Sequence, residues 1–394
     1  MKIAHLADLH LGFRQYYRQT PAGINQREAD VANAFRAAVD GVIAQSPDVV
    51  LIAGDLFHAV RPTNFSIVFA FRQLQRIREA LPATPIVAVA GNHDTPRSSE
   101  TGSILRLYEE LGIHLAIDEP RRLQFPELGL SVYAVPYAAA TGPDRFDLHP
   151  AGPEPHQVLL IHANLEGLLP SDHWSLDYGA PPLDPEILRR ERWSYVALGH
   201  YHVQHEDRPH IWYAGSLDYI GPNIWGERHD EDIRGHRKGW LLVELEAGKT
   251  VKVTPQPVPL ARSVHDAKPI DADGKSAAEV DRLIGERLHK VPGGYQNAIV
   301  RIQIRDIPRH VQRELDHAAL RQYKAAALHL QLTFYPPESS GSIGVGAPGR
   351  RQTLPEIVAE FLKRRPLPER LSREQFVALG LELLEEPADS GTGG

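Results

Sequence analysis

The chain has 394 residues, of which 42% are hydrophobic and 24% charged, and its formal net charge is −7. It contains no Cys, which excludes disulfides, thiolate metal sites and cysteine nucleophiles. No apolar run reaches the roughly 18 residues that a membrane span needs, and the first ten residues, MKIAHLADLH, do not resemble a signal peptide. We therefore expect a soluble, cytoplasmic protein without a membrane partner, on which a local basic patch can still bind nucleic acid.

The first half of the chain alternates strand and helix patterns. Short apolar runs predict strands, and apolar residues spaced by about 3.6 predict the helices between them. The elements follow in the order strand 3–7, helix 29–44, strand 49–53, helix 67–81 and strand 86–90. This order predicts an α/β fold with a largely parallel sheet and helices on one face.

Further apolar runs continue the pattern with less helix between them. They lie at 130–135, 158–161, 196–198, 211–214 and 240–245. Because strands now follow one another more closely, we expect a second, mixed sheet packed on the first. Together these elements define a predicted two-sheet unit over residues 1–249.

From about residue 250 the pattern changes. Ser276 and Glu279 form a capping box that opens a helix, and alternating runs at 299–304 and 328–334 predict half-buried strands. We therefore expect a small α+β domain over 250–337, a flexible linker over 338–352, a helical pair over 353–386 and a disordered tail over 387–394. The pair has more apolar residues than two helices can bury alone, which implies a partner surface: Ile357, Phe361, Leu362, Phe376, Leu379 and Leu383.

The strands of the first half end in potential metal ligands. Because the carboxyl ends of neighbouring parallel strands meet at one edge of a sheet, we expect these side chains to converge. They occur in DLH, GDLFH, GNHD, a single His after the strand at 158–161, and GHYH: Asp8, His10, Asp55, His58, Asn92, His93, Asp94, His162, His200 and His202.

The residue types indicate the kind of metal. Carboxylate, amide and imidazole ligands without thiolate suit manganese, iron or zinc. About seven ligands are too many for one tetrahedral ion and suit two ions that share a carboxylate, an arrangement that favours phosphoryl transfer. Gly54, Gly91 and Gly199 precede ligands where the backbone must turn and approach the site closely.

These motifs resemble those of the calcineurin-like metallophosphoesterases. Within that superfamily, DLHLG, HANLEG and AGSL make the chain similar to the SbcD family of DNA-break nuclease subunits. The motifs cover residues 8 to about 217, and beyond them the similarity lies in organisation alone. The resemblance implies a two-sheet sandwich flanked by helices, a small α+β capping domain and a C-terminal helical pair that docks on an ATPase subunit.

The resemblance also implies roles for the individual residues. One manganese ion would be bound by Asp8, His10 and His202. The other would be bound by Asn92, His162 and His200, with Asp55 bridging. His93, oriented by Asp94, would protonate the departing 3′ oxygen or position the phosphate, and His58 would support the substrate or His93. Magnesium is the alternative metal.

The implied function is manganese-dependent cleavage of DNA in break repair and recombination, by 3′-to-5′ exonuclease action on duplexes and endonuclease action on single strands or hairpins. The chain contains no P-loop, so an SbcC-like ATPase would supply ATP-driven control. A homodimer is expected through the region of Phe65, Phe69 and Phe71. Two alternatives remain: a phosphodiesterase or phosphatase acting on a small molecule, and a metal-binding scaffold without catalysis.

Three arginines follow the first motif, namely Arg14, Arg18 and Arg27. Two interpretations are open: these arginines contact DNA phosphates, or they form a solvated loop face.

Overall fold

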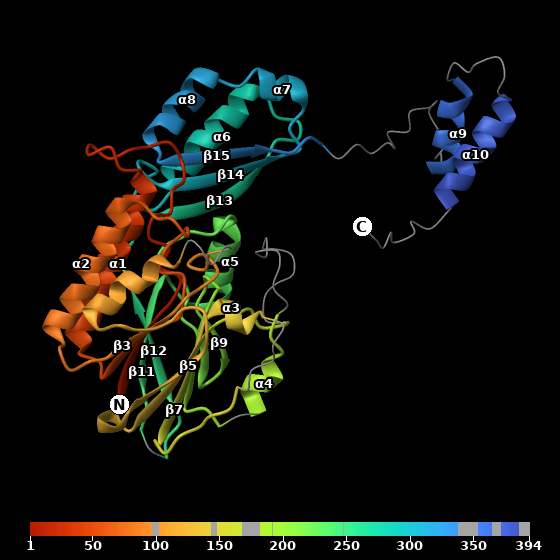
Figure 1. Cartoon of the computed structure of the whole chain (residues 1–394). Coiled ribbons are helices and arrows are strands. Elements are labelled where there is room, and N and C mark those ends of the chain that lie inside the picture. Colours follow the sequence, from red (N-terminus) through yellow and green to blue (C-terminus); the bar gives the residue numbers. More distant parts are fainter. Residues whose placement is uncertain are drawn as a thin grey trace.

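The computed structural model describes residues 1–96, 102–142, 148–167, 182–190, 192–246, 248–337, 354–364 and 372–385. Two six-stranded sheets form the larger part of the protein, and a three-stranded sheet with its own helices forms a smaller unit (Figure 1). The predicted linker at 338–352 and tail at 387–394 lie outside the described residues.

The first sheet has the strand order β12-β11-β1-β2-β3-β4. Strands β1 to β4 run parallel, whereas β11 is antiparallel to β1 and β12 to β11. The bounds of its strands are β1 Lys2–Leu6, β2 Val49–Ile52, β3 Ile86–Val89, β4 His114–Ala116, β11 Gly239–Glu244 and β12 Lys252–Pro257.

The second sheet has the order β5-β6-β7-β8-β10-β9 and is mixed, as predicted. Strands β6, β7, β8 and β10 are parallel, and the edge strands β5 and β9 are antiparallel to their neighbours. The bounds of its strands are β5 Arg121–Phe125, β6 Leu130–Val135, β7 His156–His162, β8 Tyr195–Gly199, β9 His205–Arg208 and β10 Ile211–Tyr213.

Strand β2 shows why the inner strands are apolar throughout. Val50 and Ile52 face the core beneath the helices α1 and α2, whereas Val49 and Leu51 face the core between the two sheets. A strand covered on both sides has no position for a solvated side chain, so it reads as a continuous apolar run. The helices of this unit are α1 Gln26–Gln45, α2 Asn64–Ala80, α3 Tyr137–Ala140, α4 Pro185–Arg190 and α5 Ile224–Arg234, with 3-10 turns at Ile104–Leu111 and Pro126–Leu128.

One predicted sheet assignment and one predicted boundary differ from the structure for the same reason. The run at 240–245 was expected in the second sheet, but it forms β11 and pairs with β1 in the first. Strand β12 then pairs with β11 along its whole length, so the first sheet continues to Pro257 and the predicted boundary after residue 249 falls inside a hairpin. Backbone pairing between distant strands leaves no mark in local periodicity.

The smaller unit contains the parallel sheet β13-β14-β15. Its helix α6 begins with the predicted capping box, in which the Ser276 hydroxyl accepts from the Glu279 backbone and the Glu279 carboxylate accepts from that of Ser276. The bounds of its elements are β13 Val264–Asp271, α6 Ala277–His289, β14 Ile299–Arg305, α7 Arg309–Arg313, α8 His317–Ala326 and β15 His329–Phe334.

The smaller unit contacts α5 and the loop that precedes α1 (Figure 1). The Trp225 indole donates to Gln331 Oε1 at 2.8 Å, and the Tyr16 ring stacks on His329 with ring centroids 4.1 Å apart. Arg18 donates to the Ala325 carbonyl, which ties the same loop to α8. Apolar and polar contacts thus join the two units.

Helices α9 (Leu354–Arg364) and α10 (Arg373–Glu385) pack against one another. Phe361 and Leu379 are each 55% exposed, so the pair leaves apolar side chains uncovered. None of the described helices has the length and apolar character needed to cross a membrane.

Arg27 is a buried residue of α1, so its interpretation as a solvated or phosphate-binding arginine is wrong. Its guanidinium donates to Asp218 Oδ1 at 2.9 Å, to the Tyr219 carbonyl at 2.8 Å and to Asp30 Oδ2 at 3.3 Å. Asn25 caps the helix by accepting from the Arg27 and Glu28 amides, which explains why α1 begins three residues before the predicted start. The first turn is polar because ion pairs, not apolar contacts, bury it.

We predict that Arg27→Ala lowers the free energy of unfolding by about 3–5 kcal/mol, because it removes the cation that pairs with the buried Asp218 carboxylate, whereas Asp30 keeps its ion pair with Arg262. Urea unfolding followed by circular dichroism measures this change. Arg282→Ala is the control, since it removes an exposed ion pair with Glu286 on α6 and is expected to cost less than about 0.5 kcal/mol. Equal costs for the two variants would contradict the prediction.

Candidate metal centre

The carboxyl ends of strands from both six-stranded sheets meet at one place. The loops after β1, β2 and β3 come from the first sheet, and the end of β7 and the loop after β8 come from the second. They bring together all seven residues predicted to bind metal: Asp8, His10, Asp55, Asn92, His162, His200 and His202.

One group consists of Asp8, His10 and His202. Each offers a ligand atom, and these atoms lie within 4.8 Å of one another. His10 Nε2 is buried, has no hydrogen-bond partner among the described residues, and lies 3.4 Å from Asp55 Oδ2. A buried nitrogen lone pair facing carboxylates is the environment that a divalent cation satisfies.

The other group is built around His162. Its Nδ1 lies 2.8 Å from the Ala53 carbonyl, so Nδ1 carries the proton and Nε2 presents a lone pair. That Nε2 lies 2.9 Å from Asn92 Oδ1, 3.3 Å from His200 Nδ1 and 3.5 Å from Asp55 Oδ2. Asp55 therefore faces both groups.

The backbone of the site is strained. Asp8, His10, Asp55 and His200 have φ values of 51°, 43°, 52° and 102°, in a region that L-residues seldom adopt. Each such residue costs on the order of 1–3 kcal/mol, which the surrounding structure must supply. The strain turns these side chains away from the strands and into the site.

The predicted close approach at glycines is confirmed. A Cβ on Gly54 would lie 2.2 Å from His162 Nδ1, one on Gly91 would lie 2.0 Å from Asp55 Oδ1, and one on Gly199 would lie 1.7 Å from the Ala53 carbonyl oxygen. Gly54 also has a φ of +88°. Any side chain at these positions would displace a neighbour that forms the site.

Burial governs the electrostatics of the site. Burial raises the pKa of Asp8 to about 7 against the attraction of His202, and the charge of Asp55 raises it further. Burial and the neighbouring imidazoles hold the pKa of His10 well below its usual value. A divalent cation between these side chains would favour the ionised form of Asp8 and would bind the neutral imidazole of His10.

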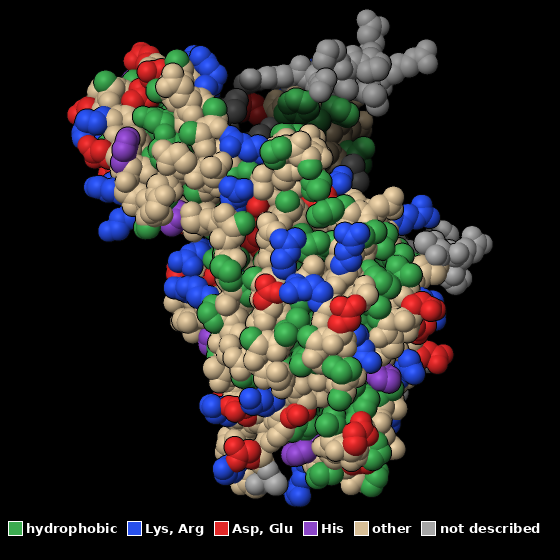
Figure 2. All heavy atoms as spheres, turned by 90° about the vertical axis from the view of Figure 1, so that its left-hand side faces the viewer, with side chains coloured by type: hydrophobic (Ala, Val, Ile, Leu, Met, Phe, Trp, Pro, Cys, Tyr) green, Lys and Arg blue, Asp and Glu red, His purple; other side chains and the backbone are tan. Residues whose placement is uncertain are grey.

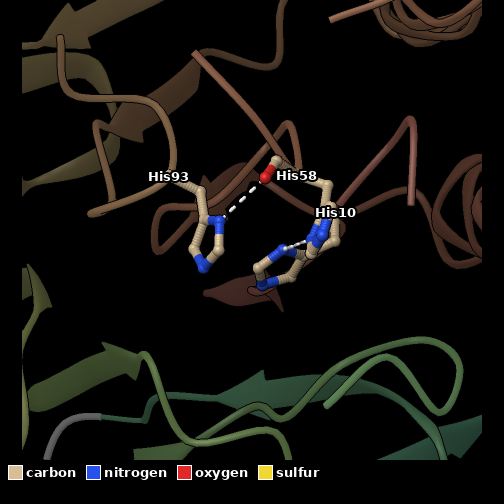
Figure 3. A group of neighbouring side chains, drawn as sticks. All are labelled: His10, His58 and His93. Atoms are coloured by element: carbon tan, nitrogen blue, oxygen red, sulfur yellow. Dashed lines mark hydrogen bonds between the residues drawn. The ribbon is translucent and has the colours of Figure 1, made fainter. Parts of the chain in front are cut away.

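His93 and His58 lie beside the first group (Figure 3). His93 Nδ1 lies 2.8 Å from the His58 carbonyl, and the two rings stack with centroids 5.1 Å apart. The His58 ring in turn places Nδ1 3.2 Å from His10 Nδ1. The His58 backbone therefore orients His93, and its side chain contacts a candidate ligand.

Asp94 is predicted to orient the His93 ring, and the contacts of its carboxylate are with the backbone. Asp94 is buried, and its carboxylate accepts from the backbone amides of Leu56, Phe57 and Gly91 at 3.0 to 3.2 Å. It thus ties the loop after β2 to the loop after β3. Backbone donors carry no sequence signature, so this contact could not be predicted.

Two features of the site were missed. Tyr137, at the start of α3, stacks on the His200 ring with centroids 6.0 Å apart, and its position after β6 is one more strand end that the same rule could have identified. Glu227 and Lys238 form a buried ion pair behind His202. No local pattern marks them, because they lie eleven residues apart, one on α5 and the other just before β11.

A two-sheet sandwich with carboxylate, amide and imidazole donors at its strand ends defines a metal-dependent phosphoesterase. The chain belongs to the calcineurin-like phosphoesterase family, whose sequence model matches residues 1–204. Divalent metal binding and phosphoester hydrolysis follow from this membership.

The chain is similar in sequence to archaeal proteins. The chain is 27% identical over 271 residues to the DNA double-strand break repair protein Mre11 of Saccharolobus solfataricus, covering 65% of each chain. It is 28% identical over 246 residues to that of Sulfurisphaera tokodaii, covering 60% of this chain and 57% of the relative. It is 26% identical over 310 residues to the protein of the same name from Methanocaldococcus jannaschii, covering 74% of this chain and 73% of the relative. The chain thus spans less than two thirds of the first two relatives.

We predict that Gly54→Ala abolishes tight metal binding, because its Cβ would displace His162. Gly274→Ala is a matched control, since that glycine also has a positive φ, +65°, but nothing lies within 4 Å of its Cβ. Both variants bear the backbone strain, and only the first changes the site. Calorimetric titration with manganese measures the difference, and wild-type binding by Gly54→Ala would refute the close approach.

Proposed function

We propose that this chain is a manganese-dependent DNA nuclease subunit of the SbcD type, acting with an SbcC-like ATPase in break repair and recombination. The activities proposed are 3′-to-5′ exonuclease action on duplexes and endonuclease action on single strands and hairpins. The observation that carries the proposal is the convergence of seven metal-ligand residues at the strand ends. The similarity to archaeal proteins named for DNA double-strand break repair supports DNA as the substrate.

The proposed ligand sets follow the two groups. Asp8, His10 and His202 hold one ion, Asn92, His162 and His200 hold the other, and Asp55 bridges them. The bridging role is supported by Asp55 Oδ2, which lies 3.4 Å from His10 Nε2 and 3.5 Å from His162 Nε2. Two manganese ions, or magnesium ions in their place, supply an activated nucleophile and neutralise charge on the phosphoryl oxygens.

His93 is the proposed general acid. Its Nδ1–H donates to the His58 carbonyl, which leaves Nε2 to carry the proton that moves to the departing 3′ oxygen. His58 supports this geometry through its carbonyl and its stacked ring. Asp94 supports it indirectly by holding the two loops together.

Two protein partners are proposed. The exposed Phe361 and Leu379 support docking of the helical pair α9–α10 on the ATPase subunit. A homodimer is supported by α2, where Val68 is 47% exposed and Phe65 stacks against Phe69. The face that carries α1 and α2 shows hydrophobic and basic side chains next to one another (Figure 2).

The test is cleavage of end-labelled duplex DNA. We expect shortening that depends on manganese, is blocked by chelator and is lost in Asp55→Ala, which removes the shared ligand. Asp273→Ala, an exposed carboxylate of the smaller unit, is the control and should cleave normally.

His93→Ala should still bind manganese but cleave about 10²- to 10⁴-fold more slowly, and the exposed His310→Ala should be unaffected. Hydrolysis of a phosphodiester dye with DNA left intact, even with the ATPase subunit added, would instead identify a phosphodiesterase acting on small molecules. Full cleavage by His93→Ala would refute the acid assignment.

Deleting residues 350–394 should abolish co-elution with the ATPase subunit, because it removes both exposed apolar helices. Manganese-dependent cleavage by the truncated chain should persist, because the strand ends that form the site remain. Size-exclusion chromatography of the mixed subunits measures binding. Co-elution of the truncated chain would contradict the docking assignment.

A further inference from the structure

A buried ion pair lies behind the candidate metal centre and is not used in the proposed reaction. Glu227 comes from α5 and Lys238 from the residue before β11, and their side chains are 0% and 1% exposed. Glu227 Oε2 accepts from Lys238 Nζ at 2.6 Å. Glu231, one turn further along α5, lies 3.6 Å from the same Nζ.

Both members of the pair hold His202. Glu227 Oε1 lies 3.5 Å from His202 Nδ1, on the ring. Lys238 Nζ donates to the His202 carbonyl at 2.8 Å and to Ser216 Oγ at 2.9 Å. Glu227 thus faces the imidazole at ion-pair distance, Lys238 holds the backbone of the same histidine by a hydrogen bond, and the two charged groups are hydrogen-bonded to each other.

The fit around Glu227 is tight. The Gly221 amide donates to Glu227 Oε1 at 2.6 Å. A Cβ on Gly221 would lie 2.2 Å from that oxygen and 3.3 Å from His202 Nδ1. The Gly221 amide therefore holds the Glu227 carboxylate in place next to the imidazole. A side chain at position 221 would not fit there.

Stability alone does not account for this arrangement. A buried ion pair bears a desolvation cost that its Coulomb attraction barely offsets, and apolar residues of similar volume often serve a core as well. What the pair provides is orientation. A carboxylate on Nδ1 fixes the tautomer of a histidine, leaves Nε2 as the ligand atom and increases its basicity.

We propose that Glu227, fixed by Lys238, is a positioning residue that presents His202 Nε2 to the metal ion. The proposal rests on the proposed role of His202 as a ligand. It assigns to α5 a part in metal affinity, although the helix contributes no ligand itself.

The experiment compares Glu227→Gln with Glu231→Gln in the full-length chain. Each substitution replaces one buried carboxylate that pairs with Lys238. Of the two glutamates, only Glu227 contacts His202. Calorimetric titration with manganese should show about 10- to 100-fold weaker binding of one of the two ions in Glu227→Gln. Glu231→Gln should bind as wild type does, and thermal unfolding of both variants records the shared effect on stability.

A second readout is the manganese dependence of DNA cleavage. Glu227→Gln should need a higher manganese concentration and regain wild-type cleavage at saturation, because its ligands are still present. A merely structural defect would lower cleavage at every concentration.

His202→Ala separates the inference from the site on which it rests. If His202→Ala loses one ion while Glu227→Gln binds both normally, the positioning role is overturned and the ligand assignment stands. If His202→Ala binds both ions as wild type does, the ligand assignment and the inference both fall. If Glu231→Gln loses as much manganese affinity as Glu227→Gln, the inference is also overturned. The loss would then come from destabilising the buried cluster of Glu227, Glu231 and Lys238, not from the contact with His202.

Discussion

The structure depends on one electrostatic constraint, the burial of several electron-pair donors that face one another. Asp8 and Asp55 converge with the imidazoles of His10 and His162 where water has little access. Burial disfavours the charged forms of Asp8 and His10, and a divalent cation at the centre of the cluster would favour the ionised carboxylates. The left-handed backbone at Asp8, His10 and Asp55 shows that the fold bears conformational cost to assemble the cluster.

The two-sheet architecture meets this constraint by bringing ligands from independent directions. The first sheet contributes the loops after β1, β2 and β3, and the second contributes His162 and the loop after β8. Hydrogen bonds between carboxylates and backbone amides then hold these loops together. Asp94 joins the loops after β2 and β3 through backbone amides, and the His200 amide donates to both oxygens of Asp8 at 2.9 and 3.1 Å. Ligands supplied by different sheets are thereby held by a shared set of backbone hydrogen bonds.

Much of this could be predicted from the sequence, because buried strands are continuous apolar runs and parallel strands end at a common edge. The strands at residues 130–135 and 299–305 lie close to their predicted positions, and the candidate ligands, predicted by their place after such strands, converge in the structure. Edge strand β9, with the sequence HEDR, could not be found because its polar side chains resemble a loop. The backbone partners of Asp94 and the contact of Glu227 with His202 could not be predicted for another reason: these groups are distant in the sequence, and only the folded chain brings them near.

The pairing of β1 with β11 has a consequence for how the chain is made. Strand β1 lies between β2 and β11, and the Met1 nitrogen donates to the Leu245 carbonyl at 2.9 Å, 244 residues further along the chain. At about 5–20 residues per second, synthesis takes on the order of 10 to 50 seconds to supply that partner. One edge of β1 therefore waits unpaired while most of the chain is translated. The candidate metal centre is likewise incomplete until the second sheet, which carries His162 and His200, has emerged.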